Sequence, residues 1–365
     1  MDDVAKTVSA GGKTYRYDSL VIATGGRAFV PPIDGVNLEG VFSVRTLCDG
    51  KAIQSYVKDV KSVVICGAGT IGLELALAFK HLGKDVTVIE MLDQVIPRIA
   101  DKDMADPIQE YLEKKGIKFV LNAPVRSVMG SEKVEGVSAG GAEYPCEMVV
   151  FATGVRANTQ IPKQLGFDIG PLGGVIVSST LQPFRNGVSV PDIYLAGDLI
   201  QCESAAVPRP AMSQLGSSAV RQGSVAGQNA AGGKASFGKV ASPWISVIGD
   251  MEIAGAGVPS GLASWYKVEM VAGKAAGLTR ARDYPETKEM IVKVLADAAT
   301  HKIIGAQILA GEGAAGRINW LAAVIMSGIT AEEFLVRAEN SYCPPASMVK
   351  DVVIAALEDL CENLK

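Results

Sequence analysis

A glycine-rich turn at residues 67–72 constrains the fold of this 365-residue sequence more than any other feature. Residues 63–72 read Val-Val-Ile-Cys-Gly-Ala-Gly-Thr-Ile-Gly, so an apolar strand leads directly into a GxGxxG turn. A second apolar strand ends at Glu90, eighteen residues beyond Gly72. This order of strand, glycine turn, helix and strand is typical of a dinucleotide-binding βαβ unit, so we predict an α/β fold.

The glycines of the turn match the three roles that a dinucleotide requires. Gly67 permits the tight turn, Gly69 lets the backbone approach a pyrophosphate, and Gly72 lets the helix pack close to the strand. Thr70 and Ile71 begin the helix, whose N–H groups and positive dipole end attract an anion. We therefore predict a nucleotide site and not a glycine loop without a ligand.

Glu90 stands where the second strand of such a unit ends. A carboxylate at this place accepts hydrogen bonds from the adenosine ribose hydroxyls and repels a 2′-phosphate. Because no arginine follows before Arg98, the pattern favours NADH over NADPH. A solvated glutamate at a strand end is the alternative interpretation.

The charge and cysteine patterns exclude several classes of partner. Net charge is −4 with scattered basic residues, so neither nucleic acid nor an anionic membrane is expected. No apolar run approaches the roughly 20 residues that span a bilayer, and no secretory signal is visible. The cysteines lie far apart and only two histidines, His81 and His301, accompany them, so we predict no metal site and a cytoplasmic location. Both histidines are interpreted as structural.

Two strands that end in Ala-Thr-Gly flank the glycine turn. Residues 17–25 end in Ala23-Thr24-Gly25, and residues 148–154 end in Gly154. This internal repeat predicts two related nucleotide-binding domains, one inserted in the other. The predicted boundaries are 1–48 and 156–238 for the outer domain, 49–155 for the inner domain and 239–365 for a C-terminal domain.

The C-terminal domain is predicted to be α+β, because its strands precede its helices. Its apolar helices indicate a surface for a second copy, so we expect a homodimer. We expect strands at 244–248, 291–295 and 303–309 and helices at 314–326, 331–337 and 347–364, with a small-residue helix at 211–231 before them.

Taken together, the motifs resemble the pyridine nucleotide-disulfide oxidoreductase family, and within it the NADH oxidases and coenzyme A-disulfide reductases. The resemblance implies an enzyme with FAD and NAD(H), built from two nested Rossmann-like domains and a dimerisation domain. It rests on the motifs at 23–25, 67–72 with Glu90, 152–156 (Ala-Thr-Gly-Val-Arg), 194–198 (Tyr-Leu-Ala-Gly-Asp) and 342–345 (Tyr-Cys-Pro-Pro).

The resemblance also implies roles for individual residues. It places Asp198, after Gly197, on the ribitol of FAD, and the two Ala-Thr-Gly turns beside the cofactors. Glu74 either approaches the nicotinamide or is an ordinary surface acid of the helix. Cys66, Cys146 and Cys361 are interpreted as core residues. Cys202 is either a core residue or a thiol near a flavin.

The segment with Tyr342 and Cys343 is expected, by resemblance, to reach across a dimer toward the partner's active site. The phenol of Tyr342 is a candidate hydrogen-bond partner for a peroxide, thiol or thiolate. Cys343 is either a redox-active thiol or a packed small residue.

The chain departs from the family pattern at its N-terminus. Family members begin with their own strand-GxGxxG-helix and a redox cysteine, and this sequence begins about 85 residues later than such a doubly wound sheet requires. We expect either a fragment of a longer protein or a separate N-terminal polypeptide. A family member without flavin is the third explanation.

The function expected from these features is transfer of hydride from NADH to flavin and on to a disulfide or to oxygen. A disulfide acceptor would be of the coenzyme A-disulfide or persulfide type. A non-catalytic NAD-binding subunit that has lost FAD is the alternative from another class. An NAD dehydrogenase without flavin is less favoured, because no substrate acid or base follows Glu90.

Overall fold

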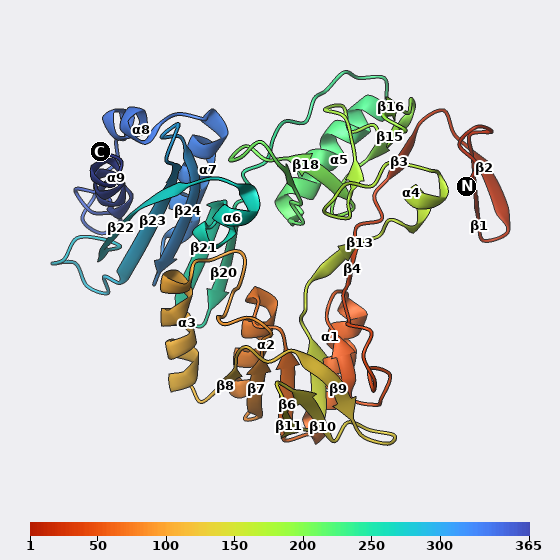
Figure 1. Ribbon diagram of the computed structural model, residues 1–365, viewed down its shortest axis with the longest axis horizontal. Helices are drawn as coiled ribbons and strands as arrows, with labels where there is room; N and C mark the ends of the chain where they lie inside the picture. The colour runs from red at the N-terminus through yellow and green to blue at the C-terminus, as the bar shows by residue number, and fades with distance from the viewer. The chain divides into compact units, whose positions relative to one another are not determined.

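The structure is a computed structural model that describes residues 1–365. It consists of two compact units, each formed from two stretches of the chain (Figure 1). The first unit contains residues 1–27 and 155–242, and the second contains residues 28–154 and 243–365. The predicted inner domain and C-terminal domain lie almost wholly in the second unit, and the boundary between them stays a prediction.

A parallel five-stranded sheet forms the centre of the nucleotide-binding part of the second unit. Its two faces are both buried, as is usual for parallel sheets. Alternate residues of β6 face opposite sides: Val63 and Ile65 pack with the helices, and Val64 and Cys66 pack with a second sheet. The strand order is β5 (Val41–Ser43), β12 (Met148–Phe151), β6 (Ser62–Cys66), β7 (Asp85–Ile89) and β8 (Lys118–Val120).

Helices and an antiparallel sheet cover this parallel sheet. Helix α2 contacts β6 and β7 directly, and residues of α3 join the same core. The helices are α1 (Leu47–Tyr56), α2 (Thr70–His81) and α3 (Lys102–Lys114), and the antiparallel strands are β9 (Val125–Met129), β10 (Gly136–Ala139) and β11 (Ala142–Pro145).

The C-terminal part of the second unit is an antiparallel sheet with helices packed on it. Helix α9 contacts β22 and β23, and α7 contacts β24 and β21. The core is continuous with the nucleotide-binding part, since Ile253 and Leu309 pack in one cluster with Ile108 of α3. The strand order is β20 (Trp244–Ile248), β21 (Met251–Gly257), β24 (Ile303–Ala310), β23 (Glu289–Asp297) and β22 (Met270–Leu278), and the helices are α7 (Ala314–Ser327), α8 (Ala331–Arg337) and α9 (Val352–Asn363).

The first unit is built around a parallel pair of strands, β3 (Leu20–Ile22) and β17 (Ile193–Leu195). Helix α5 (Gly216–Ala230) packs against both strands. The other elements assigned to this unit are short: β1 (Thr7–Ala10), β2 (Lys13–Arg16), β4 (Gly26–Ala28, whose last residue belongs to the second unit), β13 (Val155–Ala157), α4 (Gln160–Gln164), β14 (Val175–Ile176), β15 (Phe184–Arg185), β16 (Val188–Ser189), β18 (Ile200–Glu203) and β19 (Pro210–Ala211).

Several predicted elements agree with the structure, and several were wrong. The strand at 244–248 and the helix at 331–337 have the predicted bounds. The helix predicted from 211 begins at Gly216, because Ala211 pairs with Cys202 in a short ladder. The helix predicted from 347 begins after Asp351, whose side chain accepts a hydrogen bond from Val353 N and so caps it.

Two long strands of the C-terminal sheet were missed by sequence reasoning. Strands β21 and β22 are rich in alanine and glycine, which are depleted in strands generally, so their pattern carried no strand signal.

None of the helices combines the length and the apolarity that a bilayer crossing requires.

Candidate functional site

The three glycines of the central turn have different steric surroundings. A Cβ on Gly67 would lie 2.5 Å from the carbonyl oxygen of Ala152, and a Cβ on Gly72 would lie 2.1 Å from that of Gly67. A Cβ on Gly69 would meet nothing within 4 Å. Close packing therefore requires the first and third glycines, whereas the second leaves an open face for a ligand.

The open face lies at the N-terminus of α2. Gly69 is the N-cap residue, and no side chain caps this helix. The first intrahelical bond runs from Leu73 N to Gly69 O, so the N–H groups of Thr70, Ile71 and Gly72 have no partner inside the helix. These groups and the helix dipole favour an anion such as a diphosphate.

Glu90 is buried beside the turn, with 7% of its surface exposed. Its Oε2 accepts a hydrogen bond from Ala68 N at 2.9 Å, and its Oε1 accepts one from Leu92 N at 3.0 Å. The carboxylate therefore joins the end of β7 to the glycine turn. The alternative of a solvated glutamate at a strand end was wrong.

The turn after β12 lies directly against the glycine turn. A Cβ on Gly67 would lie 2.5 Å from Ala152 O and 3.3 Å from Thr153 N. Gly154 follows with a φ of +102°, and its carbonyl oxygen accepts a hydrogen bond from Phe29 N at 2.9 Å. The second Ala-Thr-Gly turn thus forms one wall of the same loop cluster.

Glu74 lies on the exposed face of α2. Its Oε1 accepts a hydrogen bond from the Ser246 hydroxyl of β20, which is itself buried. The side chain therefore connects α2 to the C-terminal sheet. Its approach to a nicotinamide stays a prediction.

In the first unit, the Thr24–Gly25 turn is held by a residue that sequence reasoning missed. Asn158 N donates to Gly25 O at 2.9 Å, and its Nδ2 donates to Thr24 O at 2.8 Å. The Thr24 hydroxyl donates back to Asn158 O at 3.1 Å. The only sequence signal was an asparagine shortly after the second Ala-Thr-Gly, too weak to assign a role.

The Gly197–Asp198 turn lies in the same unit, after β17. Gly197 has a φ of +89°, and Asp198 is 8% exposed. A Cβ on Gly26 would lie 3.5 Å from the Asp198 Cβ, so this carboxylate stands beside the Ala23–Gly25 turn. Helix α5 begins nearby at Gly216 without a side-chain cap, and Gln214 Nε2 donates to Asp198 O at 3.3 Å. A buried carboxylate beside an open glycine turn fits a polyhydroxylated cofactor such as FAD.

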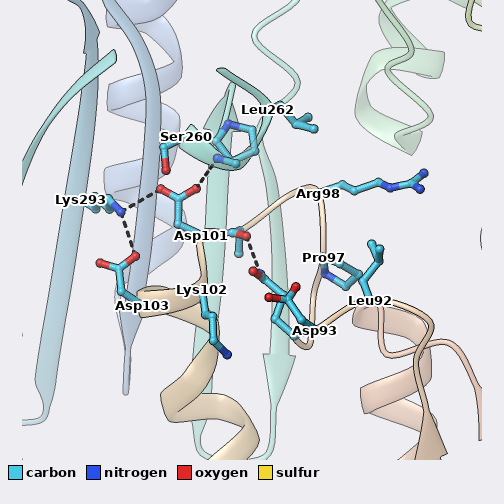
Figure 2. A pocket seen from close by; sticks show the side chains of 14 residues that line it. Leu92, Asp93, Pro97, Arg98, Asp101, Lys102, Asp103, Ser260, Leu262 and Lys293 are labelled. Carbon is cyan, nitrogen blue, oxygen red and sulfur yellow. Dashed lines mark hydrogen bonds and ion pairs between the residues drawn. The ribbon is translucent and has the colours of Figure 1, made fainter. Parts of the chain in front are cut away.

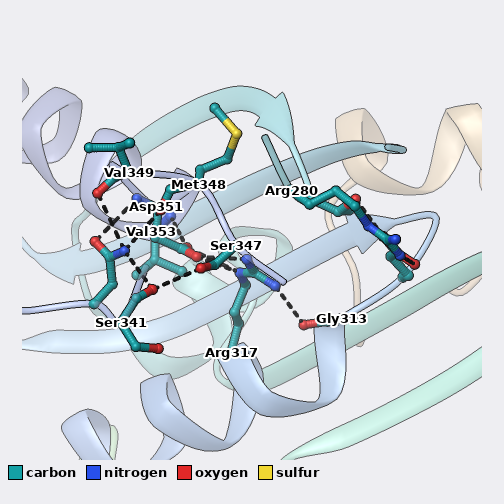
Figure 3. Close-up of polar contacts among 12 residues, drawn as sticks. Arg280, Gly313, Arg317, Ser341, Ser347, Met348, Val349, Asp351 and Val353 are labelled. Atoms are coloured by element: carbon teal, nitrogen blue, oxygen red, sulfur yellow. Dashed lines mark hydrogen bonds and ion pairs between the residues drawn. The ribbon is translucent and has the colours of Figure 1, made fainter. Parts of the chain in front are cut away.

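Tyr342 and Cys343 lie in the second unit, on an exposed turn of the C-terminal part. The Ser347 hydroxyl donates to Ser341 O (Figure 3). It also accepts from Cys343 N, and Ala281 N donates to Pro344 O. These hydrogen bonds hold the turn in shape and leave both side chains exposed. None of these hydrogen bonds connects the turn of Tyr342 and Cys343 to the glycine turn at residues 67–72.

An ion pair between Arg317 of α7 and Asp351, the residue that precedes α9, fixes the chain just after this exposed turn. Arg317 Nε donates to both carboxylate oxygens of Asp351, at 3.1 and 2.8 Å, and Arg317 Nη1 donates to Gly313 O (Figure 3). Both partners are largely buried. Because Asp351 also caps α9, the exposed turn is fixed at its C-terminal end.

Most of the other cysteines are buried and unreactive. Burial raises the pKa of the Cys66 thiol strongly, that of Cys146 to about 12 and that of Cys202 to about 11. Thiols with raised pKa values carry little thiolate at neutral pH and are poor nucleophiles. Of the two histidines, His301 pairs with Glu332 at the start of α8, which agrees with a structural role.

A cavity of about 510 Å³ lies beside the loop that follows Glu90 (Figure 2). Lys293 of β23 lies at its edge, between Asp101 at 2.9 Å and Asp103 at 2.8 Å. The Asp101 backbone N–H also donates to Gln307 Oε1 at 2.7 Å. This cluster joins the start of α3 to the C-terminal sheet.

The pKa values of Asp103 and Lys293 are both shifted in this cluster. Burial alone would raise the pKa of Asp103, but hydrogen bonds from Lys274 and Lys293 hold it below its ordinary value. Burial alone would lower the pKa of Lys293, but bonds to Asp103 and Asp101 raise it. Asp103 and Lys293 are therefore both charged at neutral pH.

This shift predicts a specific pH dependence of stability. Because the folded-state pKa of Asp103 is lowered, its contribution is present above the ordinary value of 3.8 and is lost as pH falls through the lowered pKa. As pH falls from about 4 to about 2, we expect the free energy of unfolding to decrease less in the Asp103→Asn variant than in the unmodified protein. Urea unfolding at a series of pH values measures this change. The same dependence of the free energy of unfolding on pH in both proteins would contradict the prediction.

Comparison with known proteins identifies the family. The model of the pyridine nucleotide-disulphide oxidoreductases matches residues 2–226, and that of their dimerisation domain matches residues 245–352. The chain belongs to the pyridine nucleotide-disulphide oxidoreductase family. The predicted α/β fold, with nested nucleotide-binding domains and a dimerisation domain, is confirmed, and the chain is an oxidoreductase of a family that uses FAD and NAD(H).

Individual relatives cover nearly the whole chain. An NADH oxidase of Methanocaldococcus jannaschii is 42% identical over 363 residues, which are 98% of this chain and 79% of the relative. An NAD(P)H coenzyme A polysulfide/persulfide reductase of Pyrococcus horikoshii is 34% identical over 95% of this chain and 76% of the relative. The solved structure of an NAD-dependent persulfide reductase from A. fulgidus has a TM-score of 0.92 at 32% identity, covering 98% of this chain and 67% of that one.

Proposed function

We propose that this chain oxidises NADH and reduces a small disulfide or persulfide of the coenzyme A type, with FAD between donor and acceptor. The observation that carries the proposal is the glycine turn, where Gly69 faces open space at an uncapped helix N-terminus and Glu90 is held beside it. When bound, FAD supplies two-electron chemistry between the nicotinamide and the acceptor. The persulfide reductases among the relatives support this class of acceptor.

The residues of the chain bind and orient the two cofactors in this proposal. The N–H groups of Thr70 and Ile71 hold the diphosphate, and Glu90 accepts hydrogen bonds from the ribose hydroxyls. Because the Glu90 side chain is held beside the turn, a 2′-phosphate is disfavoured and NADH is preferred. In the first unit, Asp198 accepts hydrogen bonds from the ribitol hydroxyls and Thr24 borders the same site.

At the acceptor end we assign a role to the exposed turn of Tyr342 and Cys343. In a homodimer formed through the dimerisation domain, the turn would contribute to the partner's site. The exposed phenol of Tyr342 can donate a hydrogen bond to a thiolate or a peroxide. The Cys343 thiol is exposed and therefore accessible to disulfide exchange.

Oxygen is the second candidate acceptor. The NADH oxidase that is 42% identical to this chain favours it. The two candidates differ in the compound that NADH oxidation requires. With oxygen as the acceptor, NADH is oxidised without any added disulfide, and with a disulfide as the acceptor, NADH is oxidised without oxygen.

The decisive experiment measures NADH absorbance with the purified protein and added FAD. Consumption under anaerobic conditions with coenzyme A disulfide, faster than with oxygen alone, would support the proposal. Faster consumption with oxygen would support the second candidate. Binding of NADH without consumption by either acceptor would contradict both and indicate a non-catalytic subunit.

The assigned role of Asp198 makes a further prediction. We expect Asp198→Asn to weaken FAD binding about tenfold, because a charge-assisted hydrogen bond to a hydroxyl becomes a neutral one. Titration of the apoprotein with FAD, followed by flavin fluorescence, measures the change. Asp168, which accepts bonds from Asn186 N and Gly187 N in the same unit, supplies the control variant Asp168→Asn. Equal FAD affinity in the Asp198→Asn variant and the unmodified protein would contradict the assignment.

A further inference from the structure

The most buried polar side chain of the molecule lies on helix α5. Gln222 has no exposed surface. Burying an amide costs free energy unless its oxygen and nitrogen find partners. Both ends of the Gln222 amide are therefore expected to form hydrogen bonds inside the protein.

Gln222 uses both ends of its amide. Its Oε1 accepts a hydrogen bond from Gly197 N at 2.8 Å, and its Nε2 donates to the Cys202 Sγ at 3.4 Å. Gly197 has a left-handed φ of +89°, and Asp198 follows it directly. The amide thus reaches from the helix to the turn that carries the Asp198 carboxylate.

The bond to Gly197 controls how freely that turn can move. The turn joins β17 to β18, and Ile200 N donates to Gly197 O within it. Without Gln222, Gly197 N would lose its side-chain acceptor in a partly buried place. A glycine with a positive φ has few other restraints, because it lacks a Cβ.

We infer that Gln222 is a positioning residue that fixes the Gly197–Asp198 turn for FAD. This inference rests on the proposed function, because it assumes that Asp198 binds the cofactor. The bond from Gly197 N to Gln222 Oε1 restrains the turn directly, and the weaker bond to the Cys202 sulfur satisfies the other end of the amide.

The test compares three variants. Gln222→Met keeps the side-chain length and removes both hydrogen bonds. Cys202→Ala removes only the bond to the sulfur. Asn229→Leu is the structural control, because Asn229 is also buried on α5 but bonds to Thr180 O and Ala235 O.

We expect Gln222→Met to weaken FAD binding about tenfold and to speed hydrogen exchange of the Gly197 amide about tenfold or more in the apoprotein. Cys202→Ala should change FAD affinity less than about threefold. Asn229→Leu should lower Tm without changing FAD affinity or exchange at Gly197.

The outcomes separate the inference from the proposed function. If the unmodified protein binds no FAD, the proposed function fails. If it binds FAD and Gln222→Met binds equally well, the inference is overturned. Equal weakening by Asn229→Leu would also overturn it, because loss of overall stability would then explain the effect.

Discussion

Gly69→Ala is expected to weaken NADH binding roughly a hundredfold, about 3 kcal/mol, without lowering Tm. The added methyl group meets no atom within 4 Å, so the fold tolerates it. The backbone there already has φ −70°, which alanine adopts readily. The methyl group instead occupies the space where the diphosphate would approach the N–H groups of α2. Isothermal titration with NADH measures the loss.

Gly72→Ala is the matched variant of the same turn. Its Cβ would lie 2.1 Å from Gly67 O, so the helix must shift away from the strand. We expect a loss of about 2 kcal/mol in the free energy of unfolding, which is typical of overpacking. Equal NADH affinity in Gly69→Ala and the unmodified protein would contradict the assignment of this turn to the diphosphate.

Lys293→Met is expected to lower the free energy of unfolding by about 3–5 kcal/mol. Lys293 is 9% exposed and Asp101 is 5% exposed, so removal of the cation leaves a buried carboxylate without its ion-pair partner. Because Asp101 precedes α3 and Lys293 lies in β23, the loss would also loosen the contact between the helix and the C-terminal sheet. Chemical denaturation measures the change.

Lys274→Met is the control for this prediction. Lys274 pairs with Asp103 at 2.7 Å, but its side chain is 38% exposed. Surface ion pairs contribute about 0–1 kcal/mol, so we expect a small effect. If both lysine variants lost the same stability, the burial of Lys293 would not be the cause.

The parts of the site that lie close together in the sequence could be predicted. The glycine turn, the start of α2 and Glu90 fall within 24 residues, from Gly67 to Glu90, and their roles follow from backbone geometry. The strand of residues 244–248 was equally clear, because β-branched and aromatic residues favour strands. The alanine- and glycine-rich strands β21 and β22 were not predicted, since only their neighbours in the sheet stabilise them.

Sequence alone thus determined the nucleotide-binding turn, the repeated Ala-Thr-Gly motif and the family, because each depends on residues that follow one another along the chain. Only the tertiary structure decided the partners of Asn158, Gln222 and Lys293. Each partner lies far away in the sequence, as with Lys293 and Asp101, so no local pattern could indicate it. Whether a polar side chain is buried, and against which group, depends on how distant segments pack.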